Sequence, residues 1–202
     1  MKILVLYYSA TGNIFKMAQA VTKGITEVPG VVGNLRRVPE TLPQEEIRSN
    51  PAMKATAELQ RDVSIVSKKD LIKCDGLVLG TPTRFGNMCA QMKAFIDSTG
   101  DLWSKGTLVD KPAGVFCSSN SLHGGQESTL LATYLPLLHH GMLIVGLPFS
   151  LPELMKADLG GSPYGATTVV RTSEGQGPTE NDLAIARALG RRVATFTAKL
   201  RG

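Results

Sequence analysis

Apolar residues along the chain gather in short continuous runs that are separated by stretches with a helical repeat. The first run spans Ile3 to Tyr8, and three more span Gly76 to Gly80, Ala113 to Cys117 and Met142 to Val145. A weaker run covers Val31 to Val38 and ends before a proline. Continuous apolar runs of this length are typical of strands that are buried on both faces of a sheet. We therefore predict five strands at these positions.

Between the predicted strands, apolar residues recur every three or four positions, as they do on one face of a helix. These stripes extend from Ile14 to Ile25, from Met88 to Ile96, from Gln126 to Leu138 and from Leu183 to Leu200. Thr179 precedes the last stripe and Asp182 follows three residues later, which predicts a helix cap. The same spacing between Ser67 and Asp70 predicts a short capped helix before the third strand.

The alternation of buried strands and helices predicts an α/β fold, a three-layer sandwich with helices on both faces of a five-stranded parallel sheet. Because the first strand is followed by a candidate phosphate loop, the flavodoxin-like strand order 2-1-3-4-5 is favoured. A length of 202 residues predicts a single domain, 1–202. Segments at about 39–70 and 147–178 are longer than plain connections, so we interpret them as insertions in this domain.

The composition is that of an ordinary globular protein, with 43% apolar and 19% charged residues. A net charge of +5 favours acidic partners in general. However, Lys and Arg are spread along the chain and never form a run of five or six like charges. This dispersion predicts solvated surfaces and no nucleic-acid partner.

The cysteines and the N-terminal residues indicate where the protein resides. Cys74, Cys89 and Cys117 are not spaced as metal ligands are, so we predict no metal site. We predict reduced thiols and a cytoplasmic protein, with Cys89 and Cys117 as small core residues. The apolar start, Ile3 to Tyr8, is shorter than the core of a secretion signal. No stretch approaches the roughly 18 apolar residues that insert into a membrane.

Polar loops follow three of the predicted strands. They contain Ser9 to Ile14 after the first strand, Thr81 to Asn87 after the third and Ser118 to Gly125 after the fourth, and all are rich in hydroxyl groups, Gly and Asn. Such residues are also common in simple turns. The carboxyl ends of parallel strands form the ligand crevice in folds of this class, so three such loops at one edge favour a binding site.

The first loop has the features of a phosphate site. A helix begins directly after it, which provides unpaired backbone N–H groups and a positive dipole end. Ser9 and Thr11 add hydroxyl donors, and Gly12 lets the backbone approach an anion. The loop lacks both G-x-G-x-x-G and G-K-[ST], which disfavours a dinucleotide-binding Rossmann site and a P-loop. It also lacks the acids of a phosphoacceptor site.

Several motifs resemble one known family. The stretch YYSATGNIFKMA resembles the phosphate loop of flavodoxins, which holds the phosphate of FMN. The stretch GTPTRFGNMCAQMKAFIDSTGDLW closely resembles the WrbA-type NAD(P)H:quinone oxidoreductases, as do RVPET, GGQES, HHGM and GGSPYGATT. The similarity runs from the first strand to the last helix. It implies a flavodoxin-like fold, FMN as cofactor, NAD(P)H and quinones as substrates, and a homotetramer.

The resemblance also implies roles for individual residues. The FMN phosphate is held by Ser9, Ala10, Thr11, Gly12, Asn13 and Ile14. The flavin ring is lined by Thr83, Arg84 and Phe85, and its other polar side by Ser118, Ser119, Asn120, Ser121, Leu122, His123 and Gly124. The family histidine at the flavin, reached from a neighbouring subunit, corresponds to His139, and an aromatic wall of the substrate pocket corresponds to Trp103. The resemblance requires no catalytic acid or base from the protein.

Two positions depart from the family pattern. Thr11 replaces an aromatic residue that often lies beside the nicotinamide or quinone, which predicts a more open or more polar pocket. Asn120 replaces a glycine in a fourth-strand loop that is one residue longer, and Asn tolerates left-handed backbone. Simpler interpretations remain for other residues: His139 as part of a structural pair at a helix end, His123 as solvent-facing, and Trp103 as buried against the first insertion.

Three functions are compatible with these observations. An enzyme would pass a hydride from NAD(P)H through the flavin to a quinone, with two electrons per turnover. A flavodoxin-type electron carrier would work by one-electron steps, but such carriers are typically acidic and flank the flavin with aromatic residues. A regulatory nucleic-acid-binding protein is supported by net positive charge alone. We therefore favour the enzyme.

Overall fold

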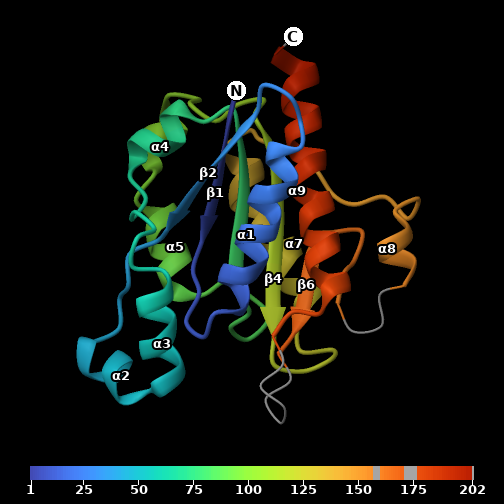
Figure 1. Ribbon diagram of the computed structural model, residues 1–202. Coiled ribbons are helices and arrows are strands. Elements are labelled where there is room, and N and C mark those ends of the chain that lie inside the picture. The colour runs from blue at the N-terminus through green and yellow to red at the C-terminus, as the bar shows by residue number, and fades with distance from the viewer. Residues whose placement is uncertain (157–159, 171–176, 202) are drawn as a thin grey trace.

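The computed structural model describes residues 1–156, 160–170 and 177–201 (Figure 1). Its sheet has the order β2-β1-β3-β4-β5, and β6 pairs with β4. The strands are β1 (Lys2–Tyr7), β2 (Val32–Arg37), β3 (Gly76–Pro82), β4 (Pro112–Ser119), β5 (Leu143–Ile144) and β6 (Ala166–Val169). All paired strands run parallel. The predicted α/β fold and the strand order 2-1-3-4-5 are therefore confirmed.

Helices connect these strands and flank the sheet. They are α1 (Asn13–Thr26), α2 (Gln44–Ser49), α3 (Pro51–Leu59), α4 (Lys68–Lys73), α5 (Ala90–Asp97), α6 (Gly100–Ser104), α7 (Gln126–His139), α8 (Pro152–Met155) and α9 (Glu180–Arg201). In Figure 1, α1 and α9 lie side by side over one face of the sheet, and α5 and α7 lie behind the other. No described helix is both long and apolar enough to cross a bilayer.

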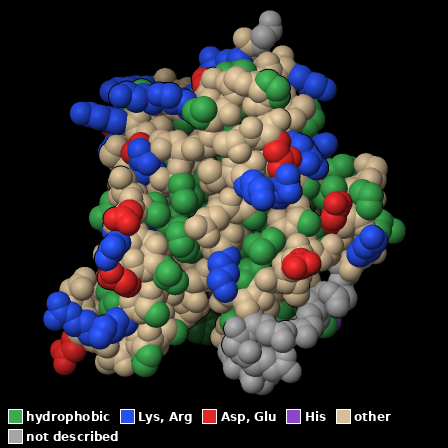
Figure 2. All heavy atoms as spheres, viewed as in Figure 1, with side chains coloured by type: hydrophobic (Ala, Val, Ile, Leu, Met, Phe, Trp, Pro, Cys, Tyr) green, Lys and Arg blue, Asp and Glu red, His purple; other side chains and the backbone are tan. Residues whose placement is uncertain are grey.

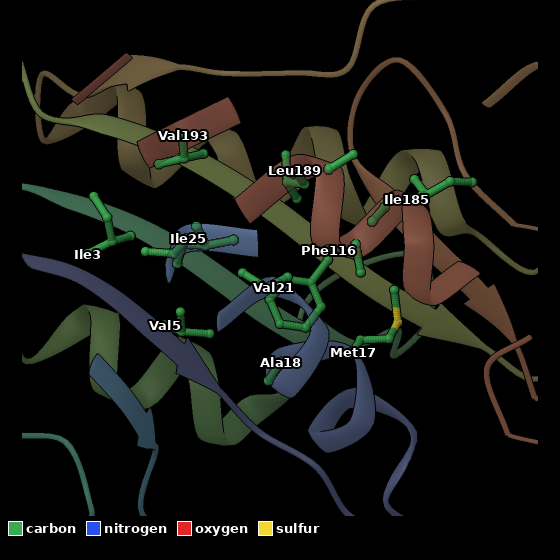
Figure 3. Close-up of a cluster of buried hydrophobic side chains, with 14 of the residues drawn as sticks. Ile3, Val5, Met17, Ala18, Val21, Ile25, Phe116, Ile185, Leu189 and Val193 are labelled. Carbon is green, nitrogen blue, oxygen red and sulfur yellow. The ribbon is translucent and has the colours of Figure 1, made fainter. Parts of the chain in front are cut away.

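The core divides into two clusters because successive strand residues point to opposite faces. Ile3 and Val5 belong to the cluster beneath α1 and α9, whereas Leu4 and Leu6 belong to the cluster beneath α5 and α7. Figure 3 shows the first cluster, in which apolar side chains of α1 and α9 converge on Phe116 of β4. Burial on both faces explains why these strands are continuous apolar runs in the sequence.

The predicted fifth strand is shorter than its apolar run. β5 covers two residues, which pair with Pro112 and Ala113 of β4. The remaining length of the β4 edge, from Phe116 to Ser119, pairs with β6. A strand and the short helix α8 therefore lie within the segment 147–178, although 157–159 and 171–176 of that segment lie outside the described residues.

Both predicted helix caps are present. The backbone N–H of Thr179 donates to the Asp182 carboxylate at 3.0 Å, and the backbone N–H of Asp182 donates to the Thr179 hydroxyl at 3.1 Å. At the start of α4, the backbone N–H of Ser67 donates to Asp70 at 2.8 Å. These caps satisfy N–H groups that have no partner within a helix.

Candidate functional site

A cavity of about 360 Å³ lies at the carboxyl ends of β1, β3 and β4. Its walls include the predicted residues Ser9, Ala10, Thr11, Asn13, Ile14, Thr83, Arg84, Ser118, Ser119, Asn120, Ser121 and Gly124. Pro82, within the predicted loop after the third strand, also lines it, as does Val170, which the sequence analysis did not identify. Val170 directly follows β6, the strand that the sequence analysis missed. The volume falls within the range of about 300–1,000 Å³ that is usual for small-molecule sites.

Ser9 shapes the loop before α1. Its hydroxyl oxygen accepts hydrogen bonds from the backbone N–H groups of Gly12 and Phe15, both at 3.2 Å. Gly12 has a φ of 92°, so the chain turns sharply into the helix at a conformation that favours glycine. The backbone N–H groups of Asn13 and Ile14 have no partner among the described residues. These amides, at the positive end of α1, form a cradle for an anion.

Residues of the first insertion contact this loop. Gln60 follows α3, and its amide donates to the Ser9 carbonyl at 3.1 Å while accepting from the Tyr7 hydroxyl at 3.1 Å. Thr56 is buried beside Gly12, where an added Cβ would lie 3.4 Å from the Thr56 hydroxyl. Sequence reasoning missed both residues because only the unusual length of the insertion indicated a role for it.

The loop after β3 forms one wall of the cavity. The Thr83 backbone N–H donates to the Ser118 carbonyl at 2.8 Å, which links it to the neighbouring strand. Arg84 and Asn87 close a tight turn by two backbone bonds of 2.7 and 3.0 Å. Phe85 occupies that turn with a φ of 53° and is fully exposed, so it stands outside the cavity of a single chain.

The loop after β4 forms the opposite wall. Ser119 is buried, donates to the Ser121 carbonyl at 2.8 Å and accepts from the Gln126 amide at 3.0 Å. Two residues of this loop have a left-handed backbone, His123 with a φ of 58° and Gly125 with a φ of 90°, and Asn120 is not one of them. Leu122 and His123, which the family resemblance placed beside the flavin, are exposed and lie outside the cavity lining. The exposure of His123 agrees with its alternative interpretation as a solvent-facing residue.

His139 and Trp103 lie away from this cavity. His139 ends α7, and this helix of 14 residues starts beside Ser119, so its far end is roughly 20 Å away. The neighbouring His140 is buried and bonds the Thr99 hydroxyl at 2.9 Å. Burial, and secondarily the adjacent His139, lowers the pKa of His140 below its usual range. Trp103 is 58% exposed, which contradicts the alternative interpretation that it is buried against the first insertion.

The three cysteines are free and buried. Burial raises the pKa of the Cys74 thiol to about 11 and raises that of Cys89 and Cys117 as well, so all three are protonated at neutral pH. The described residues contain no group of three His, Cys, Asp or Glu side chains that could hold a metal. Cys89 and Cys117 are core residues, as predicted.

The fold and the cavity define a flavodoxin-like protein with a site for a phosphorylated, planar ligand. The donor set fits FMN, because the amides before α1 suit its phosphate and the two hydroxyl-rich walls can flank a flat ring. A family model described as NADPH-dependent FMN reductase matches residues 1–153. The chain belongs to this family.

Comparisons with individual proteins agree with this assignment. The chain is 49% identical to an NAD(P)H dehydrogenase (quinone) of Solidesulfovibrio magneticus, with 100% of both chains covered. It is also 49% identical to a protein of the same name from Geotalea daltonii, with 99% of this chain and 98% of that one covered. Among solved structures, a WrbA-like flavodoxin from Agrobacterium tumefaciens has a TM-score of 0.67 at 22% identity, with 98% of each chain covered.

Proposed function

We propose that this protein is an FMN-dependent NAD(P)H:quinone oxidoreductase that works by a two-electron ping-pong cycle. The observation that carries the proposal is the convergence of three loops on one cavity beside the unpaired amides of α1. The relatives named NAD(P)H dehydrogenase (quinone), which match over the full chain, support the same activity.

The chain contributes binding and orientation to this reaction. When bound, FMN would supply the hydride acceptor for NAD(P)H and the two-electron donor for a quinone. The amides of Asn13 and Ile14 and the hydroxyl of Ser9 would hold its phosphate, and the loops that begin at Thr83 and Ser118 would hold its ring. Thr11, within the first loop, is exposed and leaves room for the nicotinamide and the quinone to bind in turn.

The test is a spectroscopic cycle. Purified protein is loaded with FMN, NADH is added without oxygen, and the visible flavin absorbance is followed before and after addition of benzoquinone. We expect the absorbance to bleach with NADH and to return with quinone. If FMN binds but neither NADH nor NADPH bleaches it, the protein is an electron carrier. If FMN does not bind, the phosphate site is not functional.

A homotetramer is the quaternary structure we propose, supported by an apolar surface around α7. Leu131, Leu135 and Leu138 are each about half exposed and share one face of this helix. Leu143 and Ile144 of the edge strand β5 are also exposed. An apolar surface of this kind favours contact with a second copy. His139 and Trp103 lie away from the cavity of their own chain. In a tetramer, they would reach the flavin bound to a neighbouring chain.

The assembly is tested by sedimentation of the wild-type protein and two variants. We expect a mass of roughly four 21.6 kDa chains. Leu135→Arg places a charge in the apolar surface and should give smaller species, because burying an unpaired charge is strongly unfavourable. Leu200→Arg, a change at an equally exposed leucine on α9, should leave the mass unchanged. A wild-type monomer at micromolar concentration contradicts the tetramer.

We further propose a cytoplasmic protein that forms one domain and does not bind nucleic acid. The free thiols support a reducing compartment. The two core clusters on opposite faces of one sheet support a single domain. On the face shown in Figure 2, basic side chains form several separate groups with acidic and apolar ones between them, without a continuous basic band.

A further inference from the structure

A second pocket, of about 270 Å³, lies between the candidate phosphate loop and the helices α2 and α3. We call it the α2–α3 pocket. Its lining residues are Ser9, Ala10, Arg37, Glu40, Gln44, Ile47, Met53, Ala57, Gln60 and Arg61. Ser9 and Ala10 also line the larger cavity, so the two spaces are separated by the backbone of one loop. In Figure 1, α2 and α3 stand at the lower left, beside the loop that precedes α1.

Two arginines give the α2–α3 pocket its chemical character. Arg37, at the end of β2, donates from Nε to the Val63 carbonyl at 2.9 Å. Among the described residues, its terminal nitrogens have no hydrogen-bond partner and no carboxylate forms an ion pair with it. Arg61 forms ion pairs with Glu58 and Asp62 on the exposed surface. Such surface pairs contribute little, so Arg61 can exchange them for a ligand phosphate.

One carboxylate, that of Glu40, also faces the α2–α3 pocket. It accepts hydrogen bonds from the Tyr8 hydroxyl at 2.8 Å, the Gln91 amide at 3.0 Å and two backbone N–H groups. Burial opposes its ionisation, but these bonds hold the pKa of Glu40 below its usual range. The Glu40 carboxylate is therefore charged and already hydrogen-bonded within the protein, and with Arg37 and Arg61 the pocket lining has a net charge of +1.

The remaining lining suits a heterocycle better than a bare anion. Ile47, Met53 and Ala57 offer an apolar surface, and Gln44 and Gln60 offer amide donors and acceptors. The volume of about 270 Å³ is below the range of about 300–1,000 Å³ for sites that enclose a whole small molecule. The α2–α3 pocket therefore fits one end of a longer ligand.

We infer that the α2–α3 pocket binds the adenosine 2′-phosphate end of NADPH, so that the enzyme prefers NADPH to NADH. This inference rests on the proposed function. With the nicotinamide over the larger cavity, the dinucleotide crosses the loop at Ala10 and Thr11, where the small Thr11 side chain leaves the path open. Arg37 and Arg61 then flank the 2′-phosphate, a group that NADH lacks and that arginines bind in other NADP sites.

The experiment measures binding of two nucleotides that lack the nicotinamide, so it does not depend on turnover. Titration calorimetry on the FMN-loaded protein compares adenosine 2′,5′-bisphosphate with ADP. We expect the bisphosphate to bind at least about tenfold more tightly than ADP, because one charge-assisted hydrogen bond contributes a free energy of this order. Arg61→Gln should remove most of this difference, and the ratio of KM for NADH to KM for NADPH should fall about tenfold.

The matched control is Arg48→Gln on α2, which removes the same charge from the same insertion outside the α2–α3 pocket. It should leave both affinities unchanged. Arg37→Gln should reduce the preference for the bisphosphate as Arg61→Gln does. If the Arg37→Gln protein does not fold, the result for Arg61→Gln alone tests the inference. Equal affinities for the two nucleotides, binding of neither, or an equal loss with Arg48→Gln overturns the inference. Failure of NADH and NADPH to bleach the flavin while the bisphosphate binds overturns the proposed function instead.

Discussion

Replacing Gly12 by alanine is expected to weaken FMN binding about tenfold or more. Gly12 has a φ of 92°, a left-handed conformation that costs a residue with a Cβ about 1–2 kcal/mol. The loop can relieve this strain only by turning its amides away from the phosphate position. A free-energy cost of about 1.4 kcal/mol raises a dissociation constant tenfold, so strain of this size should weaken FMN binding about tenfold. Titration of FMN fluorescence quenching measures the dissociation constant.

Gly30→Ala is the matched control for this change. Gly30 also has a positive φ, of 75°, but it lies in the turn before β2 and an added Cβ there meets nothing within 4 Å. Both variants should therefore lose a similar amount of stability, about 1–2 kcal/mol. Only Gly12→Ala should lose FMN affinity. Equal FMN affinities in the two variants would show that the phosphate does not bind at the loop before α1.

The sequence predicted the parts of the fold that depend on local periodicity. Strands buried on both faces appear as continuous apolar runs, and the sheet order followed from the alternation with helices. β6 was missed because its residues, Ala166 to Val169, include two buried threonines and so do not form an apolar run. The hydroxyl of Thr168 is satisfied by Asp182 at 2.8 Å, a contact with α9 that the local pattern could not indicate.

The site could be predicted as far as it consists of loops at strand ends. Parallel strands place these loops at one edge of the sheet. The sequence alone therefore assigned the residues from Ser9 to Ile14 and from Ser118 to Ser121 to a binding site. Gln60 and Arg37 were not assigned to a site, because they reach the loop and the α2–α3 pocket through tertiary packing of the insertion. Phe85 matched a family position, yet its turn points it into solvent in a single chain.

Replacing Gly190 by alanine should strongly destabilise the close contact between α1 and α9. A Cβ on Gly190 would lie 2.1 Å from the Val21 carbonyl oxygen of α1. On the other helix, a Cβ on Gly24 would lie 1.8 Å from the Arg187 carbonyl oxygen. The two backbones therefore touch through two glycines, and neither obstructing atom belongs to a flexible side chain.

The added methyl group must push α1 and α9 apart and open the core shown in Figure 3. Overpacking of this kind costs about 1–3 kcal/mol, and the backbone obstruction favours the upper end. At about 2–4 °C per kcal/mol for a chain of this size, Gly190→Ala should lower the melting temperature by roughly 6–12 °C. Thermal unfolding followed by circular dichroism measures this shift.

Gly100→Ala distinguishes this mechanism from a general effect of removing a helical glycine. Gly100 begins α6, and a Cβ there meets nothing within 4 Å, so alanine should be neutral or stabilise by up to about 1 kcal/mol. Because α1 carries the phosphate cradle at its N-terminus, Gly190→Ala should also weaken FMN binding, and FMN should rescue part of its stability by mass action. A melting temperature of Gly190→Ala equal to that of Gly100→Ala would contradict the close packing of α1 on α9.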